Sequence, residues 1–116
     1  MTVVETPGFL RDAARVLDDE ERMAIVHALA ANPTAGDVIP GAGGLRKVRW
    51  RATGRGKRGG VRVIYYFHDE SIPLFLLNVF AKNEKSDLTK AEQNEMKALL
   101  PRLVAAYRNN KVGRTK

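Results

Sequence analysis

The chain has 116 residues, 44% of them hydrophobic and 28% charged, with a formal net charge of +7. It lacks cysteine, which excludes a disulfide framework and a thiolate nucleophile or metal site. No window approaches the roughly 18 apolar residues of a membrane span, and the start MTVVETPGFL lacks the features of a signal peptide. We therefore expect one cytoplasmic domain, residues 1–116, with a nucleic-acid or ribosomal partner, or in competition acidic protein partners.

The N-terminal third predicts a helical hairpin. Val3–Glu5 could form a short strand, and Thr6 with the following proline is typical of a helix start. Apolar residues continue at helical spacing to Leu17. The acidic residues 18–21 begin a second helix, because acids suit the positive end of the helix dipole, and Asn32 with the next proline ends it.

Two β-type runs, residues 45–51 and 61–67, follow a loop rich in Gly and Pro. The first run alternates between a basic and an apolar face. Its basic face consists of Lys47, Arg49 and Arg51. In the second run, Arg62 shares a face with Ile64 and Tyr66. Short connections imply antiparallel pairing, so we expect Arg62 to lie on the same sheet face as the basic row of the first run. A third run, 73–81, is apolar on both faces apart from one asparagine, which predicts a central strand.

A final helix follows the polar turn 82–87. Thr89 and Glu92 have the spacing of a capping box. Pro101 is expected to kink or restart this helix, and residues 109–116 to form a frayed basic tail. The predicted fold is α+β: a small antiparallel sheet of three to four strands, with the helical hairpin on one face and a C-terminal helix.

The basic charge is concentrated in one interval. Between Val38 and His68 there is no acidic residue. The same interval contains eight basic residues, namely Arg46, Lys47, Arg49, Arg51, Arg55, Lys57, Arg58 and Arg62. The rest of the chain therefore sums to about −1. Such a field suits polyanion binding. Charge alone favours a surface that only binds phosphate, whereas arginines on rigid strands can also stabilise a transition state.

Two other motifs have a simpler interpretation. Gly54, Gly56 and Gly59 match G-x-G-x-x-G, but a strand and not a helix follows, so we expect a flexible basic hairpin loop and no nucleotide cofactor. His27 and His68 lack an acidic cluster that could complete a ligand set, so no metal is expected.

The basic strand, the V-R-V-I-Y-Y strand and the turn A-K-N-E-K-S-D-L resemble the RelE/HigB family of bacterial toxins, part of the RelE/ParE superfamily. This resemblance implies a microbial-ribonuclease-type fold and the toxin component of a type II toxin–antitoxin module. Such toxins are mRNA interferases: they enter the ribosomal A site, cut mRNA without a metal and inhibit translation. They leave a 2′,3′-cyclic or 3′-phosphate end. An antitoxin, in the HigB branch usually a helix-turn-helix protein, neutralises them.

The resemblance also implies site residues. The implied catalytic residues are Lys47, Arg49, Arg62 and Lys82. The implied RNA-binding residues are Arg46, Arg51, Arg55, Lys57, Arg58, Tyr66 and Lys85. Two positions depart from RelE itself: Asn83 stands where RelE has an arginine, and about Thr89 stands where it has a tyrosine. Two alternatives remain, a ParE-like gyrase inhibitor and a non-catalytic RNA-binding module.

Overall fold

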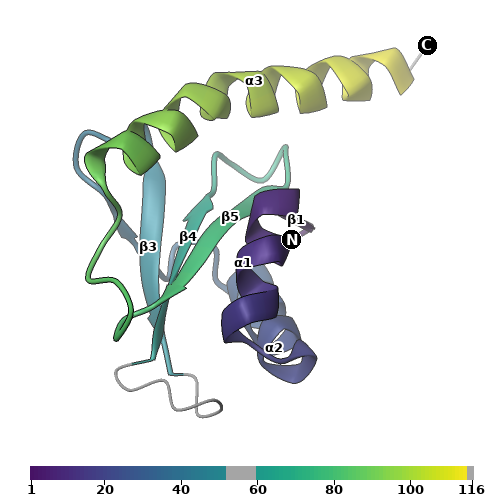
Figure 1. Cartoon of the computed structure of the whole chain (residues 1–116). Coiled ribbons are helices and arrows are strands. Elements are labelled where there is room, and N and C mark those ends of the chain that lie inside the picture. Colours follow the sequence, from purple (N-terminus) through teal and green to yellow (C-terminus); the bar gives the residue numbers. More distant parts are fainter. Residues whose placement is uncertain (52–59, 115–116) are drawn as a thin grey trace.

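A five-stranded sheet with helices on both faces forms the structure, a computed structural model that describes residues 1–51 and 60–114 (Figure 1). The elements in chain order are β1 (Val3–Glu5), α1 (Pro7–Val16), α2 (Asp19–Ala31), β2 (Asp37–Val38), β3 (Leu45–Trp50), β4 (Val61–Tyr66), β5 (Leu74–Ala81) and α3 (Lys90–Arg114). The strand order across the sheet is β1-β5-β4-β3-β2. The α+β class is therefore confirmed.

The sheet is larger than predicted, and it is mixed. Neighbouring strands from β2 to β5 pair antiparallel, but β1 pairs parallel with β5, with Val3 opposite Leu74. The prediction of three to four antiparallel strands is wrong in both respects. The two residues of β2 lie in a loop that has no periodicity, and the direction in which β1 pairs with a distant strand leaves no mark on the local sequence.

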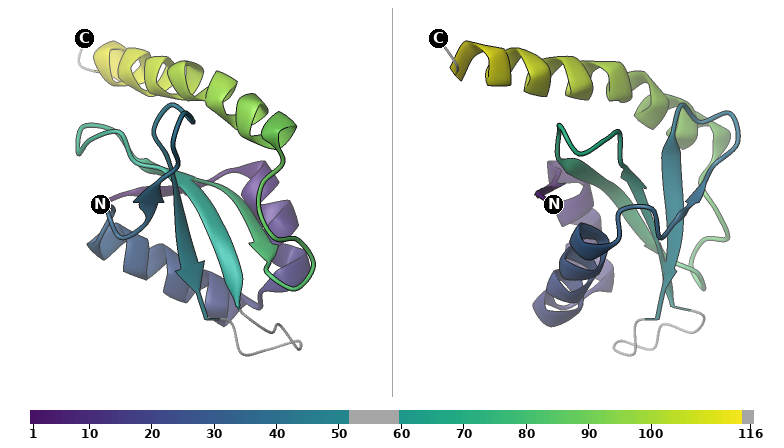
Figure 2. Two further views of the ribbon diagram at one scale, coloured as in Figure 1. Left: turned by 90° about the vertical axis from the view of Figure 1, so that its left-hand side faces the viewer. Right: turned by 180° about the vertical axis from the view of Figure 1, so that it is seen from behind.

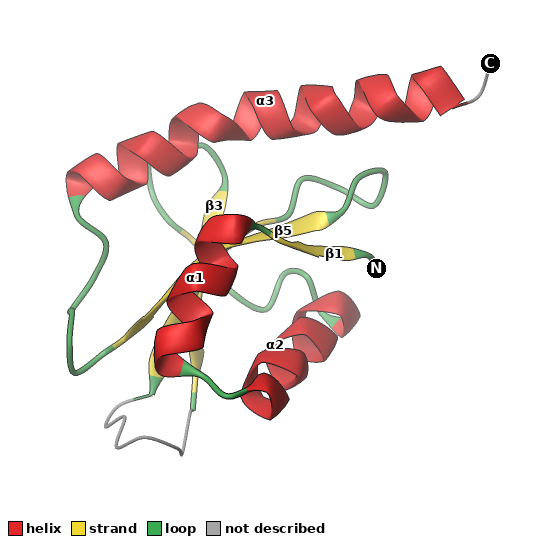
Figure 3. Cartoon of the chain, turned by 45° about the vertical axis from the view of Figure 1, so that its right-hand side comes forward, coloured by secondary structure: helices red, strands yellow, loops and turns green. Residues whose placement is uncertain are grey.

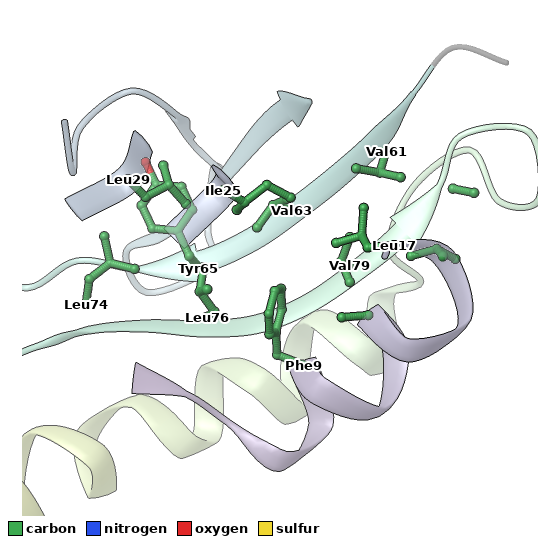
Figure 4. Packing of buried hydrophobic residues seen from close by; sticks show 13 residues of the cluster. Phe9, Leu17, Ile25, Leu29, Val61, Val63, Tyr65, Leu74, Leu76 and Val79 are labelled. Carbon is green, nitrogen blue, oxygen red and sulfur yellow. The ribbon is translucent and has the colours of Figure 1, made fainter. Parts of the chain in front are cut away.

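The main core lies between the sheet and the helical hairpin of α1 and α2. Phe9 of α1 and Ile25 of α2 are fully buried against inward-facing residues of β4 and β5, including Tyr65 and Leu76 (Figure 4). Figure 3 shows α1 in front of the strands and α2 beside it, with α3 apart from both. The predicted packing of the hairpin on one sheet face is confirmed.

All three helices begin as the sequence predicts. Thr6 Oγ1 accepts a hydrogen bond from the Phe9 amide at 3.3 Å. Asp18 and Glu21 form a reciprocal capping box at the start of α2. Thr89 and Glu92 form another before α3, with the Glu92 amide 3.1 Å from Thr89 Oγ1. These caps satisfy amide groups that have no partner within the helix.

Helix α3 covers one end of the other sheet face (Figure 2). Its Leu100 packs with Leu45, Ile64 and Phe75 in a second buried cluster. The helix is continuous through Pro101, so the predicted restart is wrong, and the kink expected at this residue stays a prediction. Pro101 is exposed, where water can hydrate the backbone carbonyl that loses its partner. The backbone is also helical from 109 to 114, where a frayed tail was predicted.

Candidate nucleic-acid interface

Basic side chains occupy the end of the second sheet face that α3 does not cover. In the β3–β4 register Arg49 lies opposite Arg62, and Lys47 lies opposite Ile64 two residues further along. Residues directly opposite in a sheet share one face. The predicted common face of Lys47, Arg49 and Arg62 is therefore present. We call these three residues, together with Lys82 and Lys85 from the loop after β5, the basic face.

Arg49 and Arg62 differ in their surroundings. Arg62 is 8% exposed, and within the described ranges it is the one charged residue among those that are buried. Its Nη1 lies 3.5 Å from the Val61 carbonyl oxygen. Arg49 is exposed, and the structure places no hydrogen-bond or ion-pair partner on it among residues 1–51 and 60–114. Like charges directly opposite destabilise a sheet, so this pair is better explained by an anionic ligand than by stability.

The loop between β5 and α3 brings an acid to Lys47. The Lys47 Nζ donates to both carboxylate oxygens of Asp87, at 3.2 and 3.1 Å. Burial opposes ionisation of Asp87, but the Leu88 amide and the Lys47 ammonium outweigh it, and Lys82 adds to them. Together they lower the pKa of Asp87 below its ordinary value. Asp87 is therefore a stable anion beside two lysines.

A second acid, Glu92, pairs with Lys85, which lies in the same loop as Asp87. Lys85 donates to Glu92 with an Nζ–Oε2 distance of 2.5 Å, and its Nζ lies 5.4 Å from the ring centroid of Phe80. Phe80 is opposite Arg62 on the neighbouring strand, so Lys85 reaches the same face. The Lys85 ammonium and then the Thr89 amide lower the pKa of Glu92. Lys82 Nζ donates to the Ser86 carbonyl at 2.9 Å.

Several predicted site residues lie elsewhere. Arg46 points to the opposite face, where its Nη1 donates to the Gly36 carbonyl at 2.7 Å. Tyr66 is 8% exposed in the cluster under α3, with its hydroxyl 3.0 Å from His68 Nδ1, and burial raises its pKa. Arg51 is exposed just after β3. Three of the predicted residues, Arg55, Lys57 and Arg58, lie outside the described residues.

Sequence reasoning did not place Asp87, Glu92 or Phe80 in the site. The sequence assigns Glu92 to helix capping alone, whereas in the structure Glu92 both caps α3 and pairs with Lys85. The signal for Asp87 was weak: it is an acid in a polar turn, 40 residues from its lysine.

Two further features of the described part of the chain bear on other classes of function. The helices there lack an apolar stretch of the length that a membrane span requires. No group of three His, Asp or Glu side chains in the same ranges is arranged to hold a metal ion.

Comparison with known proteins gives two findings. A family described as "RelE toxin of RelE / RelB toxin-antitoxin system" matches residues 1–114. Among solved structures, a mutant of the E. coli toxin RelE in the free state, with two arginines replaced by alanine, superimposes with a TM-score of 0.57. The two chains are 16% identical, and the match covers 82% of this chain and 95% of the other. At that identity the superposition shows a shared fold, and the family match carries the assignment.

Proposed function

Because the chain belongs to the RelE toxin family of toxin–antitoxin systems, we propose that it is an mRNA interferase that cuts mRNA in the ribosomal A site and thereby inhibits translation. The observation that carries this proposal is the register of β3 and β4. It sets Arg49 opposite Arg62 on one face, with Lys47 beside them. A bland surface would not concentrate cations in this way on two rigid strands.

The two arginines would hold the scissile phosphate. Burial anchors Arg62 in the sheet, and the exposed Arg49 lies opposite Arg62 on the neighbouring strand β3. Guanidinium groups make bidentate, charge-assisted hydrogen bonds to phosphate oxygens. The same donors stabilise the additional negative charge that develops as phosphorus becomes five-coordinate. Their position on strands, and not on a loop, keeps this geometry fixed.

The reaction itself uses a nucleophile that RNA supplies. The 2′-oxygen of the ribose attacks the adjacent phosphorus, the bond to the 5′-oxygen of the next nucleotide breaks, and a 2′,3′-cyclic phosphate forms. One proton leaves the 2′-hydroxyl and one is delivered to the 5′-oxygen. Lys47 and Lys82 would transfer these protons. The step needs positioning, charge stabilisation and proton transfer, and it needs no metal ion.

Other basic residues would contact the RNA backbone. Arg51, exposed just after β3, would bind a neighbouring phosphate, as would Arg55, Lys57 and Arg58, which follow it in the sequence. Lys85 would contribute from the loop. Arg46 and Tyr66 lie outside this path. Such contacts make RNA binding strongly dependent on salt.

The family assignment implies an antitoxin partner. We further propose that this antitoxin is a helix-turn-helix protein, and that toxin and antitoxin act in the cytoplasm, where translating ribosomes are found.

Mapping mRNA ends after mixing the protein with translating ribosomes tests the proposal. New ends should appear with the wild type and disappear with Lys47→Ala combined with Arg62→Ala. Arg11→Ala is a matched control, because Arg11 is an exposed cation on α1, on the other side of the sheet. Absence of cleavage by the wild type, or its survival in the double variant, would refute the proposal. Salt-sensitive RNA binding without new ends would indicate a binding module.

A further inference from the structure

Asp87 is the acidic residue that contacts Lys47, in the part of the basic face that lies on strands β3 and β4. Strands β3 and β4 contain no acidic residue, so the negative charge beside Lys47 comes from a different element, the loop before α3. Both carboxylate oxygens lie within hydrogen-bond distance of the Lys47 ammonium. Lys82 acts on the same carboxylate from the end of β5. A two-oxygen anion thus already lies among the cations that the proposed function places beside the RNA backbone, for phosphate binding or proton transfer.

A phosphodiester presents the same chemistry. Its two non-bridging oxygens share one negative charge, as the two oxygens of a carboxylate do, and both accept charge-assisted hydrogen bonds. Arg49 is the immediate neighbour of Lys47 on this face, one alternation further along β3, and it has no partner among the described residues. An anion on Lys47 that extended toward Arg49 would meet a second donor group that Asp87 does not use.

We propose that Asp87 is an internal substitute for substrate, occupying the position on Lys47 that a backbone phosphate of RNA takes when it binds. RNA binding then exchanges one anion for another at Lys47 and releases the loop from β3. This inference deepens the proposed function and rests on it for the identity of the ligand as RNA.

Separating Asp87 from Lys47 costs little free energy. The side chains of Lys47 and Asp87 are 33% and 56% exposed, so water screens their attraction. Exposed pairs of this kind contribute little to stability. The Asp87 carboxylate can therefore leave Lys47 without unfolding the loop, while still competing with an incoming phosphate.

Affinity for RNA that cannot be cut provides the test. The probe is a fluorescent single-stranded RNA with 2′-O-methyl riboses, titrated at several salt concentrations and followed by anisotropy. Asp87→Asn removes the charge but keeps the Oδ1 that accepts from the Leu88 amide. Glu20→Gln, an exposed residue in the first turn of α2, changes the net charge equally on the other side of the sheet. Lys47→Gln supplies a background in which Asp87 has lost the lysine to which it is hydrogen-bonded, while Lys82 still acts on its charge.

We expect Asp87→Asn to raise the affinity by about two- to fivefold, the size of an exposed ion pair. The plot of log affinity against log salt should also become steeper, by up to about 0.7, because the Lys47 contact then releases a counterion without exchanging Asp87. Glu20→Gln should change neither quantity. In the Lys47→Gln background, the gain from Asp87→Asn should be clearly smaller, because only the charge of Lys82 then remains beside Asp87.

Unchanged or weaker binding by Asp87→Asn would overturn the inference, as would an equal gain in Glu20→Gln or in the Lys47→Gln background. Thermal unfolding establishes that each variant folds. If Asp87→Asn does not, Asp87→Ser, which keeps a short hydrogen-bond acceptor, replaces it in the same comparison. The readout does not depend on cleavage. Wild-type protein that cuts no mRNA would refute the proposed function alone, and cleavage without the affinity gain would refute this inference alone.

Discussion

Replacing Tyr65 by phenylalanine removes one buried hydroxyl that has two partners. In the structure Tyr65 Oη donates to the Pro33 carbonyl at 2.8 Å and accepts from the Gly36 amide at 2.8 Å. These two bonds attach the segment after α2 to β4, and Gly36 in turn receives the bond from Arg46 of β3. The substitution therefore tests how the scaffold beneath the basic face is held together.

The cost follows from what remains unpaired. The Gly36 amide is buried and would lose its acceptor, whereas the Pro33 carbonyl is partly buried and can bind water. An unsatisfied buried group costs about 1–3 kcal/mol, so we expect a loss of about 2–3 kcal/mol in the free energy of unfolding. For a chain of this size that corresponds to a fall of about 10 °C in Tm. Urea denaturation and thermal unfolding followed by circular dichroism measure both quantities.

Tyr66→Phe is the matched control, one residue along on the opposite face of the strand. Its hydroxyl lies 3.0 Å from His68 Nδ1, and His68 is exposed, so water can replace the lost partner. The expected cost is about 1 kcal/mol or less. Equal losses in the two variants, or a loss below about 1 kcal/mol in Tyr65→Phe, would refute this account of the hydroxyl.

Three further predictions concern the sheet and α3. The Lys85 ammonium lowers the pKa of Glu92. The stability that the Lys85–Glu92 pair contributes is therefore present above the ordinary pKa of 4.5 and is lost as pH falls through the lowered pKa. In Glu92→Gln, Tm should depend less on pH between 6 and 3. Pro101→Ala should raise stability by up to about 3 kcal/mol, measured by urea denaturation, and a decrease would contradict the continuous helix. Gly60 has φ +72°, and a Cβ there would lie 2.3 Å from the Trp50 carbonyl oxygen. Gly60→Ala should therefore lower the free energy of unfolding by more than the roughly 1–2 kcal/mol that a left-handed backbone alone costs. A smaller loss would show that β3 moves aside freely.

Local features of the fold could be predicted because they depend on near neighbours in the chain. The caps at Thr6, Asp18 and Thr89 each join residues three apart, and alternation along β3 and β4 identified the shared face of Arg49 and Arg62. The pairing of β1 with β5 joins segments about 70 residues apart, and no local period encodes its direction. The two-residue strand β2 is too short to have a period at all.

The site, like the fold, could be predicted only where it depends on near neighbours in the chain. The count of basic residues placed Arg46 in the site, although alternation along β3 puts Arg46 and Lys47 on different faces of the sheet. The structure confirms that orientation. Tyr66 shares the face of Arg62, but α3 covers its end of the sheet, which strand periodicity cannot show. The contact between Lys47 and Asp87 spans 40 residues and depends on the path of a loop, so only a three-dimensional structure reveals it.

The chemistry of the cut ends tests the central claim most directly. The protein would be mixed with ribosomes that hold a defined mRNA, and the ends on both sides of the cut would be identified by mass spectrometry. Attack by the 2′-oxygen predicts a 2′,3′-cyclic or 3′-phosphate upstream, a 5′-hydroxyl downstream, and no cut when the ribose at the cleavage position lacks its 2′-hydroxyl. A 3′-hydroxyl with a 5′-phosphate, or cleavage of the 2′-deoxy mRNA, would contradict the account of the basic face.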